Sequence, residues 1–256
     1  MSDYQQIKVE SSPGRLDIIL NSPPVNILNI AMMEEISDAV NDAATDTSLC
    51  ALVFRAEGKH FSAGADVGEH QEDKVAEMIN SFGRMFRRIS EVGAVTVAVV
   101  QGSALGGGCE LATFCDIVLA SDQAKFGQPE IQLGVFPPVA VVTFPILIGR
   151  NRAIELLTTG KIIGAVEAER IGLINHVFPA GEFDEKVSSF IGSLTSLSAV
   201  AISLTKKSLD LSMYLPVMEG LRQADRCYVE ELMSTDDAHE GLAAFLEKRK
   251  AVWKNM

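Results

Sequence analysis

Two glutamates of this sequence lie beside apolar segments that would keep water away from their carboxyl groups. Glu110 opens the apolar segment 111–114, and Glu130 follows Gly127-Gln-Pro at the head of the uncharged stretch 131–149. Because poor solvation raises the pKa of a carboxyl group, a pair of such groups can divide the acid and base roles of a proton transfer. Taken singly, Glu110 fits equally well as a first-turn helix residue, and Glu130 as a capping carboxylate.

Two loops of small residues could supply hydrogen-bond donors to the same reaction. The first is Gly102–Glu110 (GSALGGGCE), between an apolar run and a helical stretch, and the second is Phe61–Asp66 (FSAGAD). Glycine lets backbone N–H groups approach a ligand closely, and a helix N-terminus adds the positive end of its dipole. Acyl chemistry needs converging donors for an oxyanion, which two such loops could provide together. Each loop alone is also compatible with a plain turn, since the glycine run matches neither the P-loop nor the dinucleotide-binding pattern.

Other reactive side chains are scattered along the chain. There is no HExxH pattern, no nucleophile elbow and no Cys/His pair of useful spacing, so no metal site is expected. A lone histidine is more often a surface or packing residue than a catalytic one. The cysteines show no CxxC pairing and no signal peptide precedes them, which favours a reducing cytoplasm. The residues concerned are His60, His70, His176, His239, Cys50, Cys109, Cys115 and Cys227.

Composition and charge narrow the class of ligand. The 256 residues are 47% hydrophobic and 22% charged, which is typical of a folded globular protein with a substantial core. The 22 basic and 34 acidic residues give a net charge of −12, the wrong sign for binding a polyanion over a broad face. Nucleic acid is therefore not expected as a partner. An anionic ligand would have to be small and held by backbone N–H groups or local cations.

The stretch 131–149 (IQLGVFPPVAVVTFPILIG) is apolar enough to raise the question of a membrane span. Its three prolines, Pro137, Pro138 and Pro145, argue against one. Proline removes a backbone donor and breaks the helix that lipid would require. We therefore predict a buried loop and helix here, and no membrane association.

The elements that would position these residues follow from the hydrophobic pattern. Apolar residues at helical spacing predict helices, and short apolar runs predict strands. We expect helices at 31–44, 78–89 and 106–115, and strands at 7–10, 16–20, 51–54, 94–100, 116–120, 124–126 and 174–178. This alternation predicts an α/β fold whose uniformly apolar strands are buried in a covered sheet.

Beyond Gly149 the pattern is almost entirely helical. The stretch 182–250 could hold three amphipathic helices, with apolar residues that include Leu221, Leu232, Met233, Leu242, Phe245 and Leu246. Such a terminal layer can pack on a partner subunit or cover its own chain, and periodicity alone does not decide between them. No linker or low-complexity run divides the chain. We predict a core of residues 1–195 followed by a helical C-terminal subdomain of residues 196–256.

Four motifs, in this order along essentially the whole chain, resemble the crotonase superfamily of enoyl-CoA hydratases and isomerases. They are Phe61-Ser-Ala-Gly-Ala-Asp66, Gly106-Gly-Gly-Cys-Glu110 with Cys115-Asp116, Phe126-Gly-Gln-Pro-Glu-Ile131 with Leu133-Gly134, and Phe245-Leu-Glu-Lys-Arg249. The resemblance implies an α/β fold built as a crotonase-like spiral of ββα units with a helical C-terminal trimerisation subdomain. It also implies a homotrimer or dimer of trimers. Its substrate would be an acyl-CoA thioester, so that coenzyme A enters as part of the substrate and no separate cofactor is required.

The same resemblance implies roles for particular residues. The N–H groups of Ala65 and Gly107 match an oxyanion hole that stabilises the thioester enolate. Glu110 and Glu130 match two hydratase glutamates, of which one activates water and the other donates a proton. Contacts with CoA or the acyl group are expected at Asn26, Ile27, Ala63, Asp66, Val67, Phe136, Pro137, Phe245 and Lys248, the last two reaching the nucleotide end of CoA from an adjacent subunit.

One departure from the superfamily pattern concerns the acyl pocket. Where many members have a Gly-rich turn, this chain has Gly134-Val-Phe-Pro-Pro-Val-Ala140, which is bulkier, and stiffer because proline fixes φ. This segment, with Val67-Gly-Glu-His70 and the tail 231–253, most resembles the cyclohexa-1,5-dienecarbonyl-CoA hydratases of anaerobic aromatic degradation. That resemblance implies hydration of a cyclic conjugated dienoyl-CoA, cyclohexa-1,5-diene-1-carbonyl-CoA, to 6-hydroxycyclohex-1-ene-1-carbonyl-CoA.

Three alternative functions stay open. An ordinary enoyl-CoA hydratase of fatty-acid-type substrates uses the same two glutamates. An isomerase typically needs one carboxylate base, so the presence of both Glu110 and Glu130 favours a hydratase. A non-catalytic family member, serving as an assembly subunit or an RNA-binding protein, would tend to lose a glutamate or gain basic surface, and this chain does neither.

Overall fold

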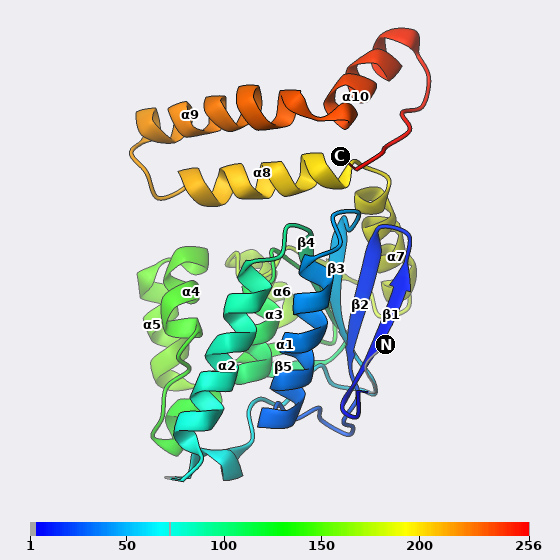
Figure 1. Cartoon of the computed structure of the whole chain (residues 1–256). Helices are drawn as coiled ribbons and strands as arrows, with labels where there is room; N and C mark the ends of the chain where they lie inside the picture. The colour runs from blue at the N-terminus through cyan, green and yellow to red at the C-terminus, as the bar shows by residue number, and fades with distance from the viewer. Residues whose placement is uncertain (1–3, 72, 256) are drawn as a thin grey trace.

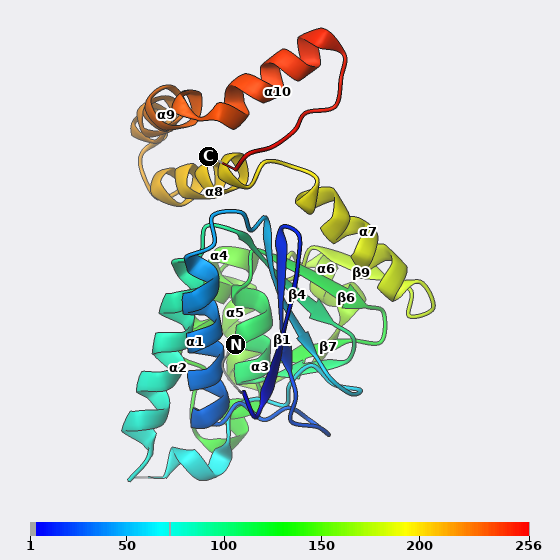
Figure 2. The ribbon, with the colours of Figure 1, turned by 45° about the vertical axis from the view of Figure 1, so that its right-hand side comes forward.

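The computed structural model describes residues 4–71 and 73–255, and a six-stranded sheet forms its centre. The strand order is β1-β2-β3-β4-β6-β9. β1 and β2 form an antiparallel hairpin that turns at Gly14, where φ is +71°, and the other neighbouring strands are parallel. The strands are β1 (Ile7–Ser12), β2 (Arg15–Leu20), β3 (Ala51–Ala56), β4 (Val95–Val100), β6 (Ile117–Ser121) and β9 (His176–Phe178) (Figures 1 and 2).

A second, three-stranded sheet has the order β5-β7-β8. Its strands are β5 (Ser103–Leu105), β7 (Lys125–Gly127) and β8 (Ile163–Gly164). The chain enters it directly from the large sheet, since β4 is followed by β5 and β6 by β7. The helix α3 (Gly107–Phe114) then follows β5, and the 3₁₀ helix η2 (Pro129–Leu133) follows β7. This repeated order of strand, strand and helix confirms the predicted α/β spiral of ββα units.

Both faces of the large sheet are buried at its central strands β3, β4 and β6. In β3, Leu52 and Phe54 belong to one hydrophobic core and Ala51 and Val53 to the other, because successive side chains of a strand alternate. The first core includes side chains of α1 (Ile30–Ala44), α2 (Val75–Ser90) and α3, and the second is closed by α7 (Phe183–Thr195) (Figure 2). A strand covered on both faces needs apolar residues throughout, which explains the uninterrupted apolar runs of the sequence.

A layer of C-terminal helices stands apart from the body that carries the sheets (Figures 1 and 2). It consists of α8 (Ala199–Ser212), α9 (Val217–Arg226) and α10 (Asp236–Glu247). Lys206 of α8 joins the layer to the sheet through a 2.7 Å ion pair with Asp116, beside the start of β6. The division of the chain into residues 1–195 and 196–256 stays a prediction, and its end residues 1–3 and 256 lie outside the described part.

The prediction of three helices over 182–250 was wrong. In the part of the chain that the structure describes, this stretch holds four α-helices, α7 to α10. Ser198 explains the additional break, because its hydroxyl accepts a hydrogen bond from the amide of Ala201 and so begins a new helix. Hydrophobic periodicity continues across the break, and for this reason it did not indicate the boundary.

The prediction of a buried loop and helix at 131–149 was only partly correct. Within this stretch, η2 ends at Leu133 and α4 spans Ala140–Ile148, and α5 (Arg150–Thr159) and α6 (Ala165–Arg170) follow beyond it. α4 buries Ala140, Phe144 and Ile148, whereas Val142 is 62% exposed, so one apolar face of the helix stays uncovered. Within the described residues, no single helix is long and apolar enough to cross a membrane. α7 and α8 meet that test of length and composition only as a pair with a bend of 93° between them.

Candidate active site

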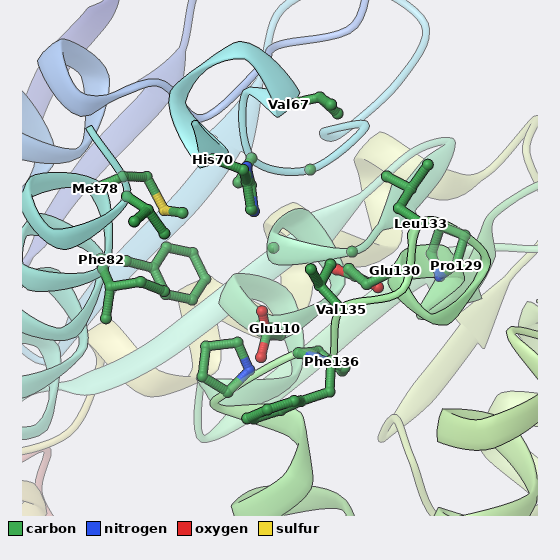
Figure 3. A pocket seen from close by; sticks show the side chains of 18 of the residues that line it. Val67, His70, Met78, Phe82, Glu110, Pro129, Glu130, Leu133, Val135 and Phe136 are labelled. Atoms are coloured by element: carbon green, nitrogen blue, oxygen red, sulfur yellow. The ribbon is translucent and has the colours of Figure 1, made fainter. Parts of the chain in front are cut away.

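A cavity of about 560 Å³ opens between α2 and the segment that joins η2 to α4 (Figure 3). Val75, Met78, Ile79 and Phe82 of α2 form one apolar wall, and residues 133–138 form the opposite wall. The predicted site residues that line this cavity are Ala63, Ala65, Val67, Gly107, Glu110, Glu130, Phe136 and Pro137. The structure therefore brings both donor loops and both glutamates to one place.

The two donor loops are held together by backbone hydrogen bonds. The amide of Ser62 donates to the carbonyl of Ser103 at 3.1 Å, and the amide of Leu105 donates to the carbonyl of Ser62 at 2.9 Å. Gly108 makes this approach possible, because a Cβ at that position would lie only 2.5 Å from the Cβ of Ser62. The loops are thus fixed relative to each other by pairing between distant parts of the sequence.

Two backbone amides border the cavity and remain available to a ligand. Among the described residues, neither the N–H of Ala65 nor that of Gly107 donates to a protein acceptor. They lie close together, because a Cβ added to Gly107 would be 3.3 Å from the nitrogen of Ala65. Gly107 is the first residue of α3, so the positive end of the helix dipole reinforces the site. Two such donors can stabilise an oxyanion that develops during acyl chemistry.

Glu110 is a buried carboxyl group with one oxygen already engaged. It lies in the first turn of α3 and is 2% exposed. Its Oε1 accepts hydrogen bonds from the amides of Val139 at 2.7 Å and Ala140 at 2.8 Å, at the start of α4. Burial raises the pKa of Glu110 to about 8, with the charge of Glu130 adding to the effect and the two amides opposing it. A proton on this group therefore belongs on Oε2.

Glu130 is the second cavity carboxyl group, in η2, and it is half-buried. Gly106 packs directly against the side chain of Glu130, since a Cβ at Gly106 would lie 2.5 Å from Oε1 of Glu130. The side-chain amide of Gln128, oriented with its nitrogen toward the available acceptors, donates at 3.2 Å to Oε2 of Glu130 and to the carbonyl of Gly106. Burial raises the pKa of Glu130, and the positive charge of His70 opposes that rise.

The two glutamates are arranged to hold one proton between them. Both are desolvated and face the same cavity, and the charge of Glu130 raises the pKa of Glu110. Two like charges in such a site are costly, so one group stays protonated while the other ionises. An acid and a base thereby stand beside an oxyanion site, which is the combination that adding water to an activated double bond requires.

Five predicted contact residues do not line the cavity. Asn26 is fully buried, and its side chain binds the amide of Ser22 and the carbonyls of Glu57 and His60, so it holds loops in place. The cavity lining also omits Ile27, Asp66, Phe245 and Lys248, of which the last two belong to the C-terminal layer at and after α10. The cavity lining does not support contact of Asn26, Ile27 and Asp66 with CoA or the acyl group, and these contacts stay a prediction. The contact of Phe245 and Lys248 from an adjacent subunit stays a prediction.

Sequence reasoning missed two functional candidates. Gln128 is fully buried and binds Glu130, yet its type alone gave no signal beyond its place between Gly127 and Pro129. His70 lines the cavity, although it stands in the sequence as one of several scattered histidines. Its position five residues after the oxyanion-loop Ala65 was the signal that could have identified it.

The chain belongs to the enoyl-CoA hydratase/isomerase family, whose pattern matches residues 11–256. A probable enoyl-CoA hydratase of Rhizobium meliloti (strain 1021) is 37% identical over 256 residues, which cover 98% of this chain and 99% of that protein. The cyclohexa-1,5-dienecarbonyl-CoA hydratase of Thauera aromatica is 35% identical and covers 98% and 96% of the two chains. The crystal structure of an enoyl-CoA hydratase from Bacillus anthracis superimposes with a TM-score of 0.93 at 30% identity, covering 98% of this chain and 100% of that one.

These comparisons confirm the crotonase fold, and at the level of the family they confirm the prediction of an acyl-CoA hydratase. The resemblance to cyclohexa-1,5-dienecarbonyl-CoA hydratases does not stand out from the resemblance to other hydratases. The Thauera protein is one of several relatives of similar identity, and enoyl-CoA hydratase is the commoner name among them. The identity of the acyl group is therefore a matter for proposal.

Proposed function

We propose that the protein is an enoyl-CoA hydratase that adds water across the α,β double bond of a straight-chain 2-enoyl-CoA. The observation that carries this proposal is the meeting of two desolvated carboxyl groups, Glu110 and Glu130, with two available amides in one cavity. Hydration needs one group that takes a proton from water, one that gives a proton to carbon, and a site for the enolate oxygen. The cavity contains groups for all three tasks.

The reaction proceeds with a balanced transfer of protons. The thioester oxygen is held by the N–H groups of Ala65 and Gly107, which favours the flow of electrons toward it. The carboxylate of the glutamate pair takes a proton from water as the water oxygen bonds to the β-carbon. The enolate then takes the proton of the other glutamate at its α-carbon. One proton has left the pair and one has entered it, so the product is the 3-hydroxyacyl-CoA and the pair keeps one proton.

A cyclic dienoyl-CoA is the second candidate substrate. Phe136 and Pro137 line the cavity, as the stiff wall inferred from the sequence requires, and the Thauera relative supports this class. However, the side chain of Phe136 is 66% exposed, so within one chain it does not close the cavity around a ring. The straight-chain thioester is therefore our first candidate substrate and the cyclic dienoyl-CoA our second, which is the reverse of the order inferred from the sequence.

A comparison of two thioesters tests this order. We expect kcat/KM for crotonyl-CoA to exceed that for cyclohexa-1,5-diene-1-carbonyl-CoA by about tenfold or more. A poor fit between a substrate and its pocket costs roughly 1–3 kcal/mol of transition-state binding. Loss of the enoyl absorbance and the mass of the hydrated product measure both reactions. A preference for the ring thioester would restore the cyclic substrate. Absence of turnover with either would reject hydratase activity and favour a non-catalytic family member.

We also propose that the protein is cytoplasmic, binds CoA only as part of its substrate, requires no metal, and assembles as a homotrimer or a dimer of trimers. The C-terminal layer supports the assembly, because Phe245 is 82% exposed and Leu246 is 80% exposed on α10. Large apolar side chains that cluster on a surface are typical of subunit interfaces. Light scattering should give three or six times the chain mass of 27.6 kDa. A stable, fully active monomer would contradict both the assembly and a shared CoA site.

A further inference from the structure

The histidine of the cavity takes no part in the reaction described above. His70 is the last residue of the 3₁₀ helix η1 (Val67–His70), and its ring lines the cavity. Its Nδ1 lies 2.8 Å from the carbonyl oxygen of Asp66. Because a carbonyl oxygen can only accept a hydrogen bond, this contact places a hydrogen on Nδ1. The other ring nitrogen, Nε2, carries a hydrogen only when the imidazole is positively charged.

His70 and Glu130 approach the same space from different elements. Figure 3 shows the ring of His70 extending from η1 into the cavity, toward the space that Glu110 and Glu130 border from the other side. The positive charge of the ring lowers the pKa of Glu130 and so opposes the effect of burial. A cation in a cavity with apolar walls acts on a carboxylate more strongly than it would in water.

Few other ionisable groups line the cavity that His70 and Glu130 share. α2 presents apolar side chains to the cavity, Asp66 caps η1 by accepting a backbone hydrogen bond, and Glu69 accepts one from the first residue of α1. The thiol of Cys109, which Glu130 also influences, has its pKa raised far by burial and stays neutral. Among the described lining residues, the ionisable side chains are those of Glu110, Glu130 and His70.

We propose that His70 is a positioning residue for Glu130: its ring, fixed by the carbonyl of Asp66, enters the cavity that Glu130 also borders and, when protonated, favours the carboxylate form of that glutamate. This rests on the proposed function, in which Glu130 is one of the two proton-transfer groups. His70 acts through Glu130 and passes no proton to the substrate. Asp66 contributes by fixing the ring through Nδ1.

The variant His70→Asn tests the proposal directly. The amide nitrogen of asparagine can replace Nδ1 as donor to the Asp66 carbonyl, while Nε2 and the charge are removed. We expect one limb of the pH profile of kcat/KM for crotonyl-CoA to move to higher pH by about one unit, since a nearby opposite charge lowers a carboxyl pKa by roughly 1–3 units. The limb that moves should be the one that Glu130→Gln removes. His176→Asn, an exposed histidine on β9, is the matched control and should leave the profile unchanged.

A double variant separates this effect from a structural one. In a Glu130→Gln background, His70→Asn should shift nothing further, because the group on which it acts is gone. An unmoved limb, a shift to lower pH, or a shift that persists in the Glu130→Gln background would each overturn the proposal. His70→Gln, which keeps a polar side chain without the charge, should move the same limb in the same direction if the asparagine variant folds poorly.

A measurement without substrate distinguishes this proposal from the proposed function. Carbon-13 NMR of labelled glutamate carboxyl groups, with Glu130→Gln to assign the signal, should show the pKa of Glu130 rising by about one unit in His70→Asn. An active wild type with an unchanged Glu130 titration would overturn the role of His70 alone. A shifted titration in a protein without hydratase turnover would support the coupling of the two groups and reject the reaction.

Discussion

Replacing either Glu110 or Glu130 by glutamine is expected to lower kcat for enoyl-CoA hydration by about 10²- to 10⁴-fold. Glutamine keeps the shape and hydrogen-bonding capacity of glutamate but cannot exchange a proton in the same way. Because the pair handles one acid and one base step together, the double variant should be only slightly slower than the slower single one. Steady-state kinetics on purified variants, with crotonyl-CoA as substrate, provide the measurement.

The control for both variants is Glu77→Gln, an exposed residue of α2 outside the cavity lining, which should keep the wild-type rate. Stability supplies a second check on Glu110. Its folded pKa of about 8 lies above the ordinary value of 4.5, so its contribution to stability is complete below pH 4.5 and is lost progressively as the pH rises from there to about 8. Glu110→Gln should therefore gain Tm relative to the wild type on moving from about pH 6 to about pH 9. Near-normal turnover in either glutamine variant would refute the role of that residue.

The substitution Gly107→Ala should have the second large effect, lowering kcat by about 10²- to 10³-fold. The new methyl group would lie 3.3 Å from the nitrogen of Ala65 and 3.1 Å from Cε2 of Phe82. It would therefore occupy the space in which the thioester oxygen must meet both N–H donors. Loss of one oxyanion donor typically costs this much, and the ground-state binding of CoA should change far less. Kinetics should thus show a fall in kcat with a smaller change in KM.

Gly192→Ala in α7 is the matched control for this experiment. A Cβ at Gly192 meets no atom within 4 Å, and alanine is a better helix former than glycine. This variant should keep its activity and gain slightly in stability. If Gly107→Ala turned over like the control, the oxyanion site would have to be placed elsewhere in the cavity.

The sequence predicts those parts of the fold that depend on local pattern. The buried strands are apolar on both faces, so β3 and β4 could be placed to within two residues, and Pro13-Gly14 marked the hairpin. β5 and β8 were not predicted, because β5 lies within the small-residue loop 102–110 and β8 has only two residues. Their existence depends on pairing with β7, which is fixed only once the chain has folded.

The site was predictable where its chemistry requires unusual residue types. Small residues expose backbone amides, and carboxyl groups at the head of apolar segments are desolvated, so both loops and both glutamates could be proposed from sequence. The relation of His70 and Gln128 to Glu130 was not predicted, because it depends on how η1, β7 and η2 meet in space. The hydrogen bonds by which Asn26 holds loops in place were not predicted either, because residue type alone does not distinguish such a buried amide from one that contacts a ligand.

The hydrogen bonds from Val139 and Ala140 to Glu110 have a consequence for how this enzyme can diverge. The segment 131–138 begins beside Glu130, within η2, and ends next to the amides bound to Glu110, so both of its ends are fixed at the glutamates that we propose as the proton-transfer groups. Its exposed middle, which includes Phe136, can change in size and shape without moving either end. Substitutions in this segment can therefore change the acyl preference without changing the proton transfer. Laboratory evolution of the protein toward new substrates should accept mutations within this segment while the reaction stays the same.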